Sequence, residues 1–274
     1  MKTNKNLRRY IILTYFVFWA LLGVTGYLIS LDVPVLIQNI MKNVCAWTPT
    51  FIILLMFKRL YPGLRLRDYF VSNFRAKMNF RDLLVVLVLQ FGILATAVLI
   101  FLNSKNLTLT AFPVISAAAI LPAFIMSLTS GAMGEELGWR GYMLRTYQRK
   151  YSPLKSALLV GLVWAFWHLP LWIFSGYTGS GLIVYSIFAT IGILSLSVLI
   201  TYFYNKSGNI LIAIWIHFLF NFLLQLITID FLQLLILVSI GYLLLVVILV
   251  FTQKDELLRI PPTSHLNPKQ DPQC

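Results

Sequence analysis

Charged residues are scarce in this sequence. Of its 274 residues, 11% are Asp, Glu, Lys or Arg, whereas 59% are hydrophobic. Soluble globular domains carry about a quarter charged residues, so the composition excludes an ordinary soluble domain. It indicates a polytopic membrane protein.

Cysteine and the familiar catalytic signatures are also lacking. The two cysteines, Cys45 and Cys274, cannot form a disulfide framework. The sequence contains no H-E-x-x-H zinc platform and no G-x-S-x-G nucleophile elbow. We therefore interpret Ser195, Ser197 and Thr201 as helix-packing residues rather than nucleophiles.

Most of the sequence consists of long apolar runs. Eight of them have roughly the 17 to 25 residues that a membrane-spanning helix needs. They cover residues 10–31, 35–57, 83–102, 112–133, 154–174, 182–204, 210–227 and 231–251. We predict an all-α bundle of about eight transmembrane helices. It forms one integral-membrane domain over residues 1–253, followed by a short disordered cytoplasmic tail over residues 254–274.

The net charge of +13 is distributed unevenly. Twenty of the 22 basic residues precede the first run or follow the second, fourth, sixth and eighth, whereas Lys42 and Lys105 fall on the other side. The positive-inside rule then places both termini in the cytoplasm. We attribute the charge to orientation and to attraction for lipid headgroups, not to nucleic-acid binding. The basic, aromatic segment 58–81 is predicted to lie along the cytoplasmic interface.

Two adjacent carboxylates lie within the hydrophobic body, Glu135 and Glu136. Ionisable groups kept at membrane depth are costly and usually functional. Glu136 lies four residues before Arg140, so the two can pair on one helix face and hold the geometry of a site. Glu135 projects about 100° away, where it can face other helices.

Small residues share this stretch. Gly131, Gly134, Gly138 and Gly141 fall on one stripe of a helix expected to run on towards Arg145, and such stripes allow a neighbouring helix to approach closely. Because the glutamates lie a few turns from the basic cluster, we expect them to be reachable from the cytoplasm.

Two further runs carry histidines. His168 follows Trp164 by one turn and precedes Pro170, which forbids a regular helix just beyond. His217 and Asn221 are four residues apart and point in one direction. Polar side chains that converge within an apolar helix indicate a site.

These residues suffice for hydrolysis of a peptide bond by water. Removed from water, Glu135 is a stronger proton acceptor and can act as general base, with His168 orienting the water or sharing its proton. His217 and Asn221 can donate hydrogen bonds to the developing oxyanion.

A metal-dependent version of this chemistry stays open. Glu135, His168 and His217 match the ligand set of a catalytic zinc ion with one open position. The spacing does not separate zinc-assisted from metal-free hydrolysis.

At these residues the sequence resembles the CPBP intramembrane proteases, which include the type II CAAX prenyl endopeptidases and the bacterial Abi proteins. The motifs of that family, E-E-x-x-x-R, F-x-x-x-H and H-x-x-x-N, are matched in order by Glu135, Glu136 and Arg140, by Trp164 and His168, and by His217 and Asn221. Trp164 stands in the aromatic place of the second motif. The resemblance covers roughly residues 131–225.

The resemblance implies a membrane-embedded endopeptidase that opens towards the cytoplasm, with Glu135 as the activating carboxylate. It implies membrane-embedded or lipid-anchored proteins or peptides as substrates, a location in a bacterial cell membrane, and either zinc or a glutamate-dependent mechanism. Many bacterial relatives are linked to bacteriocin maturation or self-immunity. The sequence itself shows no feature that recognises a prenyl chain.

The alternative is a non-catalytic membrane protein of the same fold, either a bacteriocin self-immunity factor or a proton-linked transporter. Intramembrane Glu and His residues also serve proton relays. Against a transporter, we find no inverted repeat with interrupted helices in both halves.

Overall fold

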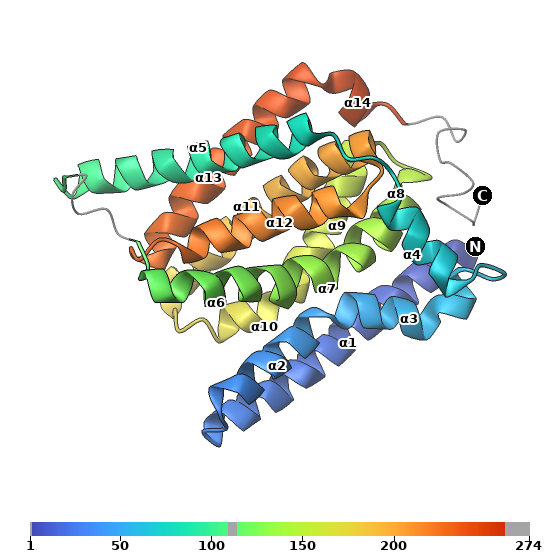
Figure 1. The fold of residues 1–274 in the computed structure, drawn as a ribbon, viewed down its shortest axis with the longest axis horizontal. Coiled ribbons are helices and arrows are strands. Elements are labelled where there is room, and N and C mark those ends of the chain that lie inside the picture. Colours follow the sequence, from blue (N-terminus) through green and yellow to red (C-terminus); the bar gives the residue numbers. More distant parts are fainter. Residues whose placement is uncertain (1, 109–113, 261–274) are drawn as a thin grey trace.

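The computed structural model of the chain describes residues 2–108 and 114–260, most of which are helical (Figure 1). Within these residues there is no β-strand, and one isolated antiparallel bridge joins Val114 to Ile227. The elements are α1 (Lys2–Ser30), α2 (Val35–Ala46), α3 (Thr48–Leu60), α4 (Leu66–Phe74), α5 (Phe80–Ser104), α6 (Ala117–Ser127), η2 (Leu128–Ala132), α7 (Met133–Glu136), η3 (Leu137–Leu144), α8 (Arg145–Gln148), α9 (Pro153–Trp167), α10 (Leu169–Ile173), α11 (Gly179–Ser207), α12 (Ile210–Gln225), α13 (Phe231–Thr252) and α14 (Lys254–Leu258).

Among the described residues, five helical stretches are long and apolar enough to cross a membrane: α1, α5, the stretch from Ala117 to Gln148, α11 and α13. The pair α2 and α3 passes the same test together, and α9 and α12 are shorter apolar helices. These elements cover most of each of the eight apolar runs; in the fourth, α6 begins at Ala117, and residues 112–113 lie outside the described residues. The prediction of an all-α polytopic membrane bundle is confirmed.

The second apolar run is broken near its middle. Between α2 and α3 the axis bends by 49°, with Trp47 at the junction and Pro49 in the first turn of α3. Proline is accepted in a first turn because its missing N–H has no intrahelical partner there. The span expected over residues 35–57 therefore consists of two helices.

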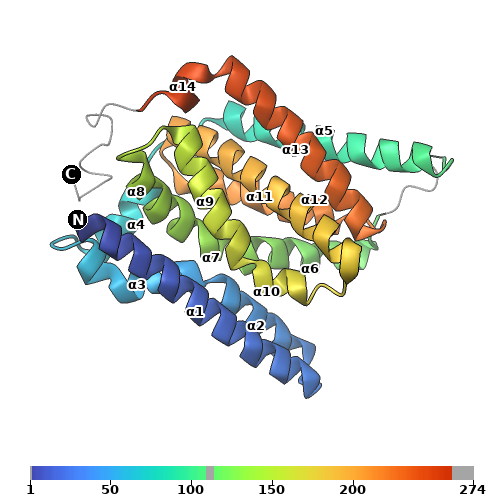
Figure 2. The same cartoon turned by 180° about the vertical axis from the view of Figure 1, so that it is seen from behind.

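The helices are arranged in layers (Figures 1 and 2). The blue helices α1 to α3 cover one side, and α5 and α13 lie on the opposite side. Between them run α6, α7, α9, α11 and α12, where α11 packs on α9 and α13, and α12 packs on α5 and η2. The carboxylates and histidines singled out in the sequence lie in this middle layer.

Helix α4 is bound more closely to the bundle than an interfacial segment would be. Tyr69 and Asn73 are buried, and the Tyr69 ring meets Phe57 and Tyr61 at 5.6 and 4.9 Å between centroids. The predicted interfacial helix thus also covers the end of α3.

The beginning of α1 and the whole of α14 lie at the same end of the bundle as α4 and α8 (Figure 1). The basic loops of the sequence gather at this end, where Lys206 at the end of α11 pairs with the buried Asp82 of α5 at 2.9 Å. The tail predicted from residue 254 begins as helix α14, whose Leu257 is buried. The tail beyond residue 260 lies outside the described residues.

Candidate active site

The segment that carries both glutamates is not one regular helix. After α6, the backbone leaves helical geometry at Ser130 (φ −94°, ψ 45°) and Gly131 (φ 170°, ψ −88°). Helix α7 then restarts at Met133, and η3 continues with π-helical turns, a feature found frequently at functional sites. The prediction of an unbroken helix through this stretch is wrong at Ser130 and Gly131.

Residues near the bend between α2 and α3 donate hydrogen bonds to the backbone on either side of Ser130 and Gly131. Trp47 Nε1 donates to the carbonyl of Thr129 at 2.8 Å, and Thr50 Oγ1 donates to the carbonyl of Gly134 at 2.7 Å. A buried carbonyl released from a helix ladder needs such a partner. The two helices therefore stabilise the irregular backbone from outside.

Two glycines of the predicted stripe account for this close approach. A Cβ added to Gly134 would lie 2.7 Å from Trp47 Cδ1, and one added to Gly138 would lie 2.5 Å from Pro49 Cβ. The close packing expected from small residues is confirmed at these positions. Gly131 instead faces the site.

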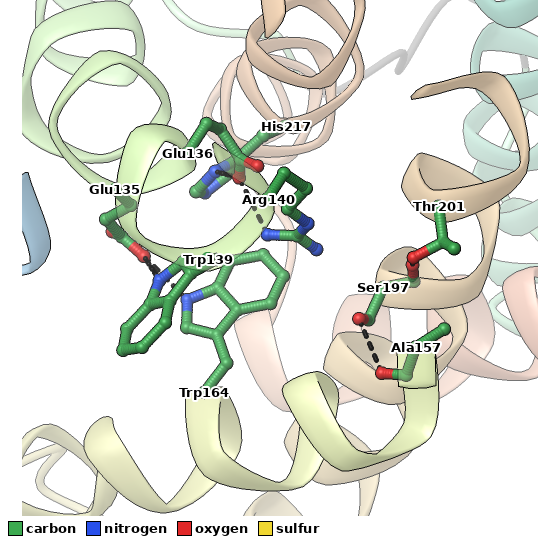
Figure 3. Close-up of polar contacts among 9 residues, drawn as sticks. All are labelled: Glu135, Glu136, Trp139, Arg140, Ala157, Trp164, Ser197, Thr201 and His217. Carbon is green, nitrogen blue, oxygen red and sulfur yellow. Dashed lines mark hydrogen bonds and ion pairs between the residues drawn. The ribbon is translucent and has the colours of Figure 1, made fainter. Parts of the chain in front are cut away.

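Glu135 is held by two tryptophans (Figure 3). Its Oε2 accepts a hydrogen bond from Trp139 Nε1 at 3.0 Å and another from Trp164 Nε1 at 2.6 Å. The carboxylate is 3% exposed, and the two donors come from η3 and α9. Hydrogen bonds to the charged form offset part of the cost of burying it.

Glu136 joins a second group of charges on the neighbouring face. Its Oε1 accepts from Arg140 Nη1 at 2.9 Å and from His217 Nδ1 at 2.8 Å. The Arg140 guanidinium lies over the Trp164 ring, 4.6 Å from its centroid. The predicted pair of Glu136 and Arg140 is confirmed, and it also orients His217, because Nδ1 carries the donated proton and Nε2 points away from Glu136.

Polar atoms from two helices converge beside Gly131. A Cβ built on this glycine would lie 2.9 Å from Asn221 Nδ2, 3.6 Å from Glu135 Oε1 and 3.6 Å from His217 Nε2. We call this point the Gly131 cradle. An amide donor, a carboxylate oxygen and an imidazole nitrogen thus surround a space that a side chain would fill.

His168 lies at the end of α9, where Pro170 in the first turn of α10 breaks the helix as predicted. Its Nδ1 donates to the carbonyl of Trp164 at 2.9 Å, so Nε2 is the free acceptor in the neutral ring. The ring lies 6.0 Å from that of Trp164 and 4.8 Å from that of Trp167, measured between centroids. The direct contacts of Glu135 are to the indoles of Trp139 and Trp164.

The helices that carry the histidines are held by other elements. Tyr15 of α1 donates to the Val163 carbonyl at 2.5 Å, and Trp19 Nε1 donates to the Trp167 carbonyl at 3.2 Å. Behind His217, Gln90 Nε2 of α5 donates to the Ile216 carbonyl at 3.3 Å. These bonds fix α9 and α12 next to the site.

The hydroxyls of α11 serve packing. Ser197 Oγ donates to the Ala157 carbonyl of α9 at 2.8 Å, and Thr201 Oγ1 donates to the Ser197 carbonyl at 2.7 Å, away from the glutamates (Figure 3). The interpretation as a helix-packing residue is confirmed for Ser197, whose bond joins two helices, whereas the bond of Thr201 lies within α11.

The zinc alternative requires three ligands around one point. In the part of the chain that the structure describes, no group of three or more His, Cys, Asp or Glu side chains is placed to hold a metal ion. The third polar group at the cradle is the Asn221 amide nitrogen, which donates hydrogen bonds and is not a zinc ligand. The side chains as placed fit an oxygen atom of water or of a carbonyl group better than a zinc ion.

One residue of the site, Trp139, was not predicted from the sequence, and the contact made by Trp164 was predicted only in part. Trp139 follows Glu135 by four residues, the same spacing that pairs Glu136 with Arg140, but tryptophan in an apolar segment was not considered as a donor. The sequence predicted Trp164 as the aromatic residue of the second motif, a place that phenylalanine takes in the family. That interpretation is incomplete, because the bond to Glu135 uses the indole N–H, which phenylalanine lacks.

The fold and the site together define a polytopic helical membrane protein with a buried cluster of carboxylates, imidazoles and an amide. Residues 116–223 match the family described as type II CAAX prenyl endopeptidase Rce1-like. The chain is also 36% identical over 99 residues to "CAAX prenyl protease 2" of Methanococcus maripaludis, a match that covers 34% of this chain and 36% of that relative. The family match contains all three motifs, and the two comparisons confirm the resemblance to the CPBP family of proteases. The aligned part spans about a third of the relative's length.

Proposed function

We propose that this protein is an intramembrane endopeptidase that hydrolyses peptide bonds of membrane-associated proteins or peptides, in the manner of a CAAX protease. The observation that carries the proposal is the Gly131 cradle, where Glu135 Oε1, His217 Nε2 and Asn221 Nδ2 face one point. A carboxylate base for the water and two partners for the oxyanion are the groups that attack by water requires.

In the proposed reaction, Glu135 Oε1 takes a proton from water, and the resulting hydroxide oxygen forms a bond to the carbonyl carbon of the substrate. The carbonyl π electrons move to its oxygen, which accepts a hydrogen bond from Asn221. The proposed second donor is Nε2 of a doubly protonated His217, whose Nδ1 is bound to Glu136. The oxyanion electrons then re-form the carbonyl, the C–N bond breaks, and the leaving amine takes the proton that Glu135 accepted, with His168 as the proposed relay.

The proposed substrates are membrane-embedded or lipid-anchored, and the proposed entrance faces the cytoplasm. Two features support this entrance: the glutamates lie a few turns from the end of the bundle that carries α4, α8 and α14, and basic residues gather there. The name of the archaeal relative adds prenylated CAAX peptides as the first class to test.

The test is peptide cleavage by purified, detergent-solubilised protein, followed by mass spectrometry. Prenylated and unprenylated C-terminal peptides are compared, each with and without a zinc chelator. The proposal expects cleavage that Glu135→Ala abolishes. Activity kept under chelation would establish the metal-free form, and activity lost and restored by zinc would establish the zinc form.

Failure to cleave either class of peptide by well-folded protein would contradict the proposal. It would favour the non-catalytic alternative, a self-immunity factor or a proton-linked transporter.

A further inference from the structure

The two oxygens of the Glu135 carboxylate have different surroundings. Oε2 accepts from Trp139 Nε1 and Trp164 Nε1, which fill its two lone-pair directions (Figure 3). Oε1 faces the Gly131 cradle instead. The carboxylate therefore presents one defined oxygen to whatever occupies the cradle.

We propose that Trp139 and Trp164 form an indole clamp, a pair of positioning residues that hold Oε2 so that Oε1 alone accepts the proton of the attacking water. This inference rests on the proposed function. In the step concerned, one O–H bond of water breaks, the proton binds Oε1, and the hydroxide oxygen bonds to the substrate carbonyl carbon.

Neutral donors suit a general base. They favour the charged form of the buried carboxylate without the strong attraction of an adjacent cation, which would make it a poor proton acceptor. The nearby cation, Arg140, is bound to Glu136 at 2.9 Å. The Arg140 guanidinium thus binds Glu136, whereas the indoles of Trp139 and Trp164 bind Glu135.

Trp164→Phe isolates the contribution of the N–H group. The second family motif has phenylalanine in this place, so the smaller ring suits the fold, and it still offers an aromatic face to the Arg140 guanidinium, which lies 4.6 Å from the Trp164 centroid. What the substitution removes is the hydrogen bond to Glu135.

Trp167→Phe is the matched control. Trp167 lies on the same helix, is 1% exposed, and its Nε1 has no hydrogen-bond partner among the described residues. Losing this N–H removes no bond to the site.

Other titratable groups around Glu135 stay unchanged in these variants. They are Tyr10 of α1, Glu136 of α7, Arg140 of η3, His168 of α9 and His217 of α12. From the bend between α2 and α3, the neutral Trp47 and Thr50 contact this segment. A change in kcat on Trp→Phe substitution therefore reports the lost indole donor.

The experiment measures kcat and KM separately for wild type, Trp139→Phe, Trp164→Phe and Trp167→Phe. We expect each clamp variant to lose about ten- to a hundredfold in kcat, the effect of one hydrogen bond to a charged group. KM should stay near the wild-type value, because the lost bond holds Glu135 and not the substrate. Trp167→Phe should keep the wild-type kcat. A wild-type kcat in Trp164→Phe would overturn the clamp.

A second readout does not depend on activity. In protein labelled with ¹⁵N-tryptophan, Glu135→Gln should shift the indole N–H resonances of Trp139 and Trp164 and leave that of Trp167 in place. Unmoved resonances of the clamp pair would refute the geometry. If the resonances shift but no peptide is cleaved by any variant, the proposed hydrolysis fails, and with it the clamp's assignment to a general base.

Discussion

Glu135 and Glu136 are consecutive in the sequence, yet they meet different partners. A helix turns about 100° per residue, so Glu135 reaches two indoles and the cradle, whereas Glu136 reaches Arg140 and His217. Glu135 keeps one oxygen available for proton transfer. Glu136 instead orients the imidazole of His217.

Gly131→Ala tests the cradle. The new Cβ would lie 2.9 Å from Asn221 Nδ2 and occupy the space that the reacting oxygen needs. We expect a loss of about a hundredfold or more in cleavage rate, comparable to removal of an oxyanion donor, with the protein still folded. Gly92→Ala, where a Cβ meets nothing within 4 Å, is the control. Equal activity in both variants would exclude the cradle as the reacting site.

Arg140→Ala should lower stability as well as activity. Arg140 and Glu136 are both 0% exposed, and removing one partner of a buried ion pair costs about 3 to 5 kcal/mol. Thermal unfolding in detergent measures this loss, with the exposed Arg67→Ala as control. Adding Glu136→Gln should recover part of the folded yield. An unfolding temperature unchanged by Arg140→Ala would contradict this account of the pair.

The sequence predicted the pairs of site residues that depend only on spacing along one helix. The pairs Glu136 with Arg140 and His217 with Asn221 are each four residues apart, and the structure places each pair on one helix face. The bond from Trp164 to Glu135 joins residues 29 apart in the sequence, so it depends on how α9 packs beside α7. No local pattern specifies that packing.

Interruptions of the helices are concentrated around the site. The break at Ser130 and Gly131 and the break between α9 and α10 at His168 both lie within the packed bundle, where neighbouring helices can satisfy the released backbone groups. Pro170 made the second break predictable. The first was missed because glycine in an apolar helix is also typical of close helix packing.

The contact of η3 with α1 and α3 depends on Gly138. A Cβ there would lie 2.5 Å from Pro49 Cβ and would also meet the Tyr10 hydroxyl. We expect Gly138→Ala to destabilise the protein by about 1 to 3 kcal/mol through overpacking, seen as a lower unfolding temperature than that of Gly92→Ala. An unchanged temperature would show that α1 and α3 can move away freely.

The two histidines of the site lie on, or at the end of, apolar helices shorter than a membrane span. Helices α9 and α12, with 15 and 16 residues, reach roughly 23 Å at 1.5 Å per residue, against roughly 30 Å for a hydrocarbon core. Hydrophobic length predicted the eight runs and the all-α class. It did not predict that the two runs carrying His168 and His217 would contain short helices, because that depends on the surrounding layers.

Charge asymmetry predicts the orientation of the bundle in the membrane. In a protein with Cys45 and Cys274 replaced by serine, Lys105→Cys should react with an impermeant thiol reagent in intact cells. Arg75→Cys, at the basic end, should react after the membrane is opened. Both positions are exposed. The reverse labelling pattern would place the basic end outside.

The most direct test of the central claim is the cleavage rate of Glu135→Gln beside wild type, at matched folded fractions in the same detergent. Glutamine keeps an oxygen for the indoles of Trp139 and Trp164 but is no longer a carboxylate base. The account predicts a loss of about a hundred- to ten-thousandfold, the usual contribution of a general base. A wild-type rate in Glu135→Gln would contradict it.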